Sequence, residues 1–294
     1  MTQATREVYF ITFLENVDSS ILNLELEHGF KVDSFDEPRF IDFMSTLDKS
    51  TDLGFKGKNI SLECLNRNDK RAYFISNSFF VKYFLKEGQE FYNTFYVGYL
   101  SPLIRKAKLF KEGNISIPFG YFHCGEGSHF RPSMTIALNQ YTRPVPFMLE
   151  EDEAKPFSKF LRDFKFPLDK PYLQLAFENF EESYHVHGND LAFLLNMIAL
   201  EILFNDGPME LKYKISRNAA VLLGKNIDDF KIIFKDIKSL YDLRSGLVHS
   251  GISNKIKDDD LIRLQDYIRR SIKKIADLKL DKKELIDFLN SKGF

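Results

Sequence analysis

Apolar positions near the C-terminal end repeat at helical spacing. From Ile227 to Gly251 (IDDFKIIFKDIKSLYDLRSGLVHSG), six positions step by three or four residues and form one stripe along a helix. They are Phe230, Ile233, Ile237, Leu240, Arg244 and Leu247. Every member is apolar except Arg244, and burying a guanidinium alone is costly. The pattern therefore predicts that Arg244 either reaches water or finds an anionic partner.

Helical periodicity extends over residues 171–294 and predicts a bundle of five or six antiparallel helices joined by short links. The expected elements are Tyr172–Tyr184; a helix capped by Asn189 or Asp190 that runs to Phe204; one from near Pro208 to Gly224; the stripe helix, capped by Asn226 and ended by Ser250 and Gly251; Lys257–Leu278; and a short helix from Asp281 to about Asn290.

The second of these helices is apolar on every side. From Leu191 to Phe204 its only polar residues are Asn196 and Glu201, so we expect it at the centre of the bundle. A buried carboxylate needs a cation, and Arg244 is the unmatched cation of the stripe helix. We therefore predict an ion pair between Glu201 and Arg244. Taken on these residues alone, an internal salt bridge with no further role is the favoured interpretation.

The first 150 residues have a different pattern. Short runs of β-branched and aromatic residues predict strands at Glu7–Phe13, Asn59–Leu65, Ala72–Ile75, Phe91–Tyr99, Asn114–His123 and Ser133–Leu138. One helix is expected at Asp36–Leu47, with Pro38 in its first turn. The fold class is therefore α+β: a β-rich mixed domain over residues 1–150, a proline-containing acidic linker over 151–170 that can carry one short helix, and an all-α bundle over 171–294.

Composition restricts the possible partners. The chain has 294 residues and a net charge of −1, so any binding of nucleic acid must depend on a local basic patch. Two cysteines, Cys64 and Cys124, are typical of a reducing cytoplasm. The N-terminus does not resemble a signal peptide, and no run reaches the roughly 18 apolar residues of a membrane span. We expect a soluble, cytoplasmic protein without membrane contact.

One cluster resembles a metal site in composition. His123, Cys124 and His129 (FHCGEGSHF) offer at most three ligands, and no fourth is evident. A glycine-containing hairpin loop is the favoured interpretation, and a loop that lends donors to a ligand is the alternative. We predict neither a metal nor another cofactor.

Arg244 and His249 are spaced as Arg-x4-His in YDLRSGLVHSG, at the end of a long helix. Two segments precede them, ALEILF (199–204) and ELKYKISRNAAVLLG (210–224). These three segments, in this order, resemble the Apea-like branch of the HEPN superfamily. The resemblance covers roughly Pro171 to Leu278. It implies a helical bundle and a metal-independent endoribonuclease whose active site forms at a homodimer interface from two copies of the motif.

The resemblance implies catalytic roles for Arg244 and His249, supported by Glu201, Ser245 and Tyr241. His249 suits proton transfer near neutral pH, and Arg244 suits stabilisation of charge on phosphate during attack by the RNA 2′-OH. Ser245 stands where many active members have Asn, Asp or His, and its hydroxyl can still donate to phosphate. Tyr241 can stack on a base or pack within the bundle, and packing is favoured.

Two functions remain from these considerations. The first is an RNA-cleaving toxin or effector in antiviral defence or stress response, in which the N-terminal domain senses an unknown trigger or recruits a protein partner. The second is a non-catalytic HEPN module that dimerises or binds RNA or a nucleotide, with Arg244 and Glu201 kept for structure.

Overall fold

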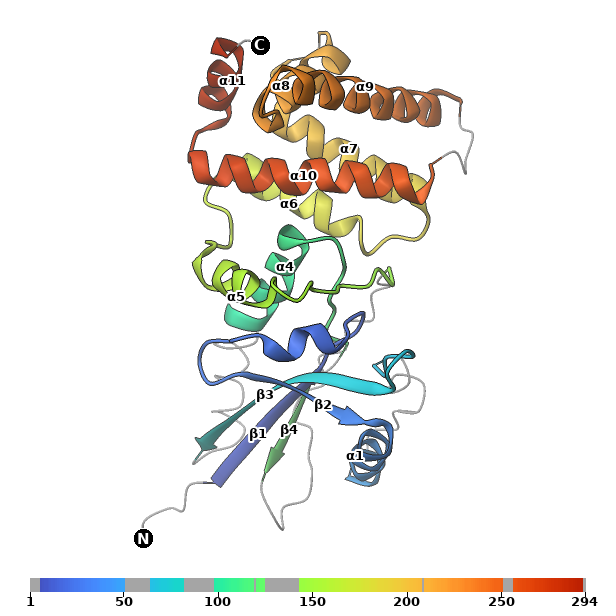
Figure 1. Cartoon of the computed structure of the whole chain (residues 1–294), viewed down its shortest axis with the longest axis vertical. Coiled ribbons are helices and arrows are strands. Elements are labelled where there is room, and N and C mark those ends of the chain that lie inside the picture. Colours follow the sequence, from blue (N-terminus) through green and yellow to red (C-terminus); the bar gives the residue numbers. More distant parts are fainter. Residues whose placement is uncertain are drawn as a thin grey trace. The chain divides into compact units, whose positions relative to one another are not determined.

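The computed structural model has two compact units (Figure 1). Unit 1 comprises Met1–Gln140 with Pro144–Phe164, and unit 2 comprises Tyr141–Arg143 with Lys165–Phe294. The structure describes residues 6–50, 64–81, 98–118, 120–124, 143–207, 209–250 and 256–292. Unit 1 is a mixed α and β structure and unit 2 is helical, so the predicted α+β fold class is confirmed.

Unit 1 is built on an antiparallel sheet of four strands in the order β2-β3-β1-β4. The strands are β1 (Arg6–Phe13), β2 (Lys31–Asp36), β3 (Arg71–Val81) and β4 (Gly120–Cys124). Strand β1 pairs along its whole length with β3, from Arg6 opposite Val81 to Phe13 opposite Phe74, and pairs on its other side with β4. The strand predicted at Glu7–Phe13 is therefore confirmed, and it is one of the two inner strands of the sheet.

Side chains of β1 alternate between two cores, because successive residues of a strand point to opposite faces. Val8 and Phe10 lie in a core that includes residues of the 3₁₀ helix η1 (Ser19–Asn23), α4 (Ser101–Phe110) and α5 (Ala154–Asp163). Phe13 lies in a second core against α1 (Glu37–Ser50). The helix predicted near Asp36–Leu47 is thus present and covers one face of the sheet (Figure 1).

The abundance of phenylalanine, 30 residues beside no tryptophan, is partly explained by this second core. The ring of Phe13 lies within 5.1–6.3 Å, centroid to centroid, of four other phenylalanine rings. These rings belong to Phe35, Phe40, Phe43 and Phe74. Three of the four contacts are edge-on, an arrangement that aromatic pairs favour and that adds to the energy of burial.

Several local predictions for the N-terminal half differ from the structure. Strand β2 and helix α4 were not predicted, and the strand expected from Asn114 begins only at Gly120. The strand expected at Ser133–Leu138 lies outside the described residues, and so do residues 59–63 of the strand expected at Asn59–Leu65. Of the strand expected at Phe91–Tyr99 only the last two residues are described, and they lie in a turn of π-helix instead. The short helix considered for the linker is present as α5, but it buries Phe157 in the core of unit 1 and so belongs to that unit. The division between the units falls after Phe164.

Unit 2 contains six helices in its described part (Figure 1). They are α6 (Pro171–Glu182), α7 (Asn189–Phe204), α8 (Leu211–Leu223), α9 (Ile227–Ser250), α10 (Asp258–Leu278) and α11 (Lys282–Ser291). Helix α7 packs against α6, α8, α9 and α10 and is therefore the central helix of the bundle. The predicted helices of this half are confirmed to within a few residues; Pro208 and Gly251 lie outside the described residues.

Two of the predicted helix caps are confirmed and the third is wrong. The side chain of Asn226 accepts a hydrogen bond from the backbone N–H of Asp229 (2.8 Å), and Asp281 forms a capping box with Glu284. The cap predicted for α7 is wrong, because the N-cap position is held by Gly188 with a positive φ of 79°. Asn189 instead donates to a carboxylate oxygen of Asp258 (2.8 Å), joining the starts of α7 and α10.

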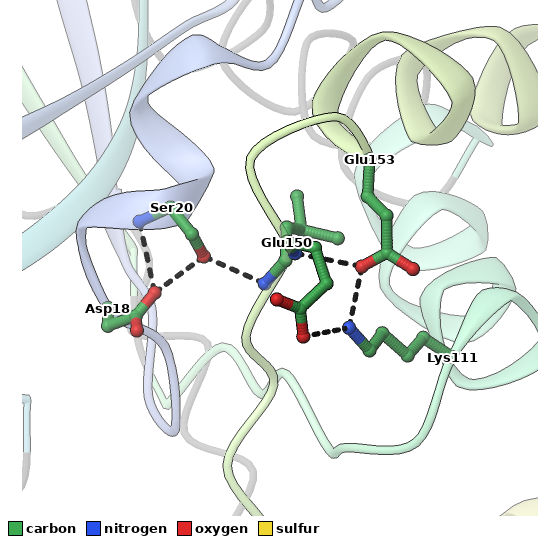
Figure 2. Close-up of polar contacts among 6 residues, drawn as sticks. Asp18, Ser20, Lys111, Glu150 and Glu153 are labelled. Atoms are coloured by element: carbon green, nitrogen blue, oxygen red, sulfur yellow. Dashed lines mark hydrogen bonds and ion pairs between the residues drawn. The ribbon is translucent and has the colours of Figure 1, made fainter.

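A polar network fixes the segment before α5 to the rest of unit 1 (Figure 2). The Lys111 ammonium lies 2.6 Å from Oε2 of Glu153 and 3.3 Å from Oε1 of Glu150. Nearby, the backbone N–H of Leu149 donates to Oγ of Ser20 (2.9 Å). Partial burial raises the pKa of the Glu153 carboxyl, but the hydrogen bond from Lys111, the hydrogen bond from the backbone N–H of Glu150 and the charge of Lys111 together outweigh it, so this pKa is lowered.

We expect Glu153→Gln to destabilise unit 1 by about 1 kcal/mol at pH 7, the scale of a partly exposed charged contact. Because the folded-state pKa of Glu153 is depressed, its contribution is complete above the unfolded-state pKa and is lost as pH falls through the folded-state value. The variant should therefore lose less stability than the wild type on acidification. Urea unfolding between pH 7 and 3 measures this. Glu151→Gln, at an exposed neighbour, is the control; identical pH profiles for both variants would contradict the prediction.

Candidate functional site

The predicted ion pair between Glu201 and Arg244 is confirmed. Nη2 of Arg244, on α9, lies 3.4 Å from Oε1 of Glu201, on α7. Arg244 reaches this position because the stripe residues before it, among them Ile237 and Leu240, are fully buried and orient that face of α9 inward. The periodicity of α9 therefore places the guanidinium beside the central helix.

The pair is less deeply buried than the sequence predicted. The side chains of Arg244 and Glu201 keep 29% and 22% of their accessible surface. Helix α7 is also not enclosed on every side, since Leu191 and Ile198 are 49% and 42% exposed. Partial exposure reduces the desolvation cost of both charges and also weakens their attraction.

The geometry at Glu201 is that of a charge contact rather than a hydrogen bond. Oε1 of Glu201 is buried and has no hydrogen-bond donor among the described residues, although the positive charge of Arg244 lies within ion-pair distance. A guanidinium has five N–H donors, and this contact engages only one of its nitrogen atoms. Arg244 therefore has further N–H groups that can bind an anion while its guanidinium stays in contact with Glu201.

Tyr241 is buried beside the pair, so the predicted packing role is confirmed. Its ring centroid lies 5.6 Å from the guanidinium carbon of Arg244. Burial raises the pKa of the Tyr241 phenol, and the charge of Glu201 and a hydrogen bond to it raise this pKa further, against the opposing charge of Arg244. The phenol is therefore protonated at neutral pH.

His249 and Ser245 lie on the outer part of the same helix. His249 is exposed in the last turn of α9, and Ser245 is half-buried. Positions five apart on a helix differ by about 140° around the axis and by about 7.5 Å along it. Arg244 points toward α7 whereas His249 faces solvent, so one chain does not direct both side chains to one point. The arrangement supplies a positioned cation and, separately, a solvent-accessible imidazole.

Lys282 is a neighbour of the site that the sequence pattern does not indicate. Its ammonium, at the start of α11, donates to the backbone oxygen of Ile202 (2.6 Å), the residue after Glu201. Burial lowers the pKa of Lys282 to about 8, against the opposing charge of Asp206. A cation at the last carbonyls of a helix stabilises that end, so Lys282 fixes the turn of α7 that carries Glu201.

The histidine and cysteine cluster considered for a metal is only partly described. His123 and Cys124 belong to β4, opposite Tyr9 and Val8 of β1, and His129 lies outside the described residues. In the described ranges, no three His, Cys, Asp or Glu residues gather in a way that could hold a metal ion.

Comparisons with known proteins find no matching family model, no matching curated protein and no matching solved structure. Within the part of the chain that the structure describes, none of the helices has both the length and the apolar content needed to cross a membrane.

Removing either partner of the ion pair should destabilise unit 2. We expect Glu201→Ala and Arg244→Ala each to cost about 1–2 kcal/mol, less than the roughly 3–5 kcal/mol of a fully buried pair, because both side chains are partly exposed. His249→Ala should change stability by less than about 0.5 kcal/mol, since His249 is exposed. Urea unfolding followed by the helical circular dichroism signal measures all three. Equal stability of the three variants would show that the pair contributes nothing.

Proposed function

We propose that unit 2 is an HEPN-like domain and that the protein is a metal-independent endoribonuclease. The observation that carries the proposal is the arrangement at the end of α9. Arg244 is held by Glu201 from the central helix, and His249, five residues later, is exposed to solvent. This arrangement lies within a helical bundle, the fold that the resemblance to the Apea-like HEPN branch implies.

The proposed reaction uses the 2′-OH of the RNA as the nucleophile. A neutral His249 imidazole accepts the 2′-OH proton while the 2′ oxygen bonds to phosphorus. The bond from phosphorus to the 5′ oxygen breaks, a protonated histidine donates a proton to that oxygen, and the products are a 2′,3′-cyclic phosphate and a 5′-OH. Arg244 stabilises the charge that develops on the phosphate oxygens, and Glu201 acts as its positioning residue.

The chemistry requires two histidines, and each chain offers one in this motif. We therefore propose a homodimer whose twofold axis passes near Arg244 and His249. An apolar surface beside the ion pair supports this assembly: Ile198 is 42% exposed one turn before Glu201, and Val248 is 50% exposed one turn after Arg244. Contact between two such surfaces would bring the motifs of both chains together.

A non-catalytic HEPN module that dimerises or binds RNA or a nucleotide is the second candidate. The observation in its favour is that Arg244 already contacts Glu201 and the ring of Tyr241, which is also what a purely structural arginine would do. The two candidates differ in the role of His249, which only the first requires.

The proposed setting is a cytoplasmic antiviral defence or stress response, as the HEPN resemblance implies. In this setting unit 1 would sense a trigger or recruit a protein partner, and unit 2 would cleave RNA.

The purified full chain should cleave RNA but not DNA of the same sequence, because DNA lacks the 2′-OH. EDTA should leave the rate unchanged, and His249→Ala should reduce it by about 10²–10⁴-fold, the usual contribution of proton transfer. Gel analysis of labelled RNA, its 2′-deoxy counterpart and the cyclic phosphate product tests this. Equal cleavage of the 2′-deoxy strand, or loss of activity in EDTA, would exclude the proposed mechanism.

Light scattering of the full chain should give the mass of a dimer. Ile198→Glu should shift the mass to that of a monomer and abolish RNA cleavage, because it introduces a charge into the proposed interface. Ile262→Glu, at a 37% exposed isoleucine on α10, is the matched control and should do neither. A wild-type monomer that cleaves RNA at full rate would contradict the proposed assembly.

A further inference from the structure

The outward face of α9 carries three lysines in line with His249. Lys231, Lys235 and Lys238 are all exposed and are spaced by four and three residues. At about 100° per residue, these lysines and His249 lie within about 40° of one line along the helix. The line from Lys231 to His249 is about 27 Å long, from the rise of about 1.5 Å per residue. The three lysines cover about 10 Å of this line, and Asp242 lies on the same line between Lys238 and His249.

The acidic residues of α9 beyond its first turn do not neutralise these lysines. Asp236 pairs with Arg263 of α10 and accepts a hydrogen bond from Tyr267 (2.9 Å). Asp242 pairs with Lys212 of α8.

Among the residues that the structure describes, none of the three lysines forms an ion pair with a carboxylate. This stretch of α9 is therefore a local basic patch on a chain whose net charge is only −1.

Aromatic rings border the lysines on the side of α8, which lies beside α9 in the bundle (Figure 1). The ring of Phe234 lies 5.9 Å from that of Tyr213, centroid to centroid, and its centroid is also 5.9 Å from the ammonium of Lys238. Tyr213 itself is 54% exposed. An exposed aromatic ring next to a row of cations is the combination that binds single-stranded nucleic acid, with bases stacked on the ring and phosphates near the lysines.

We propose that Lys231, Lys235, Lys238 and Tyr213, which we call the α9 track, bind single-stranded RNA and lead it to His249. The track deepens the proposed function, because it assigns single strands as the substrate class and gives the direction from which they reach the site. Counterion release from the phosphates supplies the affinity, and stacking on Tyr213 favours unpaired bases.

The test measures binding separately from cleavage. Fluorescence anisotropy of a labelled 12-nucleotide RNA is recorded with full-length His249→Ala protein over a range of salt concentrations. Adding Lys231→Gln, Lys235→Gln and Lys238→Gln should weaken binding and reduce the slope of log K against log salt by about 2. Each phosphate contact to a single strand contributes about 0.7 to that slope. Tyr213→Ala should weaken binding about fivefold or more.

The matched control replaces three exposed lysines elsewhere, Lys155, Lys159 and Lys283, by glutamine. It changes the net charge equally and should leave the slope close to that of the parent protein. A track variant that behaves like this control, or a parent protein that binds no RNA, would overturn the α9 track. Lysine-dependent binding to phosphatidylserine vesicles but not to RNA would also overturn it.

The outcomes separate the track from the proposed activity. If wild-type protein cleaves RNA but the track variant binds with an unchanged slope, the track is wrong and the endoribonuclease proposal stands. If the track variant loses RNA binding but wild-type protein does not cleave, the track stands and the catalytic proposal is wrong.

Discussion

The buried stripe of α9, together with the contact between Glu201 and Arg244, sets the orientation of α9 against the central helix of unit 2. The Glu201 carboxylate on the mostly apolar α7 and the Arg244 guanidinium on the apolar stripe of α9 would each be unfavourable alone. Their contact offsets part of the desolvation cost of both charges. Tyr241 lies beside the same carboxylate, and Lys282 fixes the turn that carries it. The rotation of α9 about its axis is thereby determined, and so is the direction of every other side chain on that helix.

This rotation divides α9 into two faces with different roles. The inner face carries Arg244 and the buried stripe, whereas the outer face carries the exposed lysines and His249. The cation suited to the phosphate and the imidazole suited to proton transfer therefore point apart within one chain. The proposed chemistry needs a second copy because it uses two histidines, and each chain offers one in this motif. The same rotation of α9 places the α9 track on the face of the helix that carries His249.

Unit 1 is stabilised in a different way. Its sheet is covered on both faces, and strand β1 contributes alternate residues to two separate apolar cores. The polar contacts of Lys111 then attach the segment before α5 to this framework. The ion pairs of Lys111 therefore hold a connecting segment of unit 1 in place, whereas the ion pair of Arg244 in unit 2 lies between two helices of the bundle.

The sequence by itself determined the helices of unit 2 and the partner of Arg244. Helical periodicity is local, and a single unmatched cation beside a single unmatched carboxylate leaves few alternatives. It did not determine strand β2, whose alternation of polar residues is weak and which is held by pairing with β3. Only the tertiary structure decided that α5 packs in unit 1, that α7 keeps an exposed face, and that Asn189 bonds to Asp258 instead of capping its helix. Each of these depends on contacts between residues far apart in the chain, which local patterns do not record.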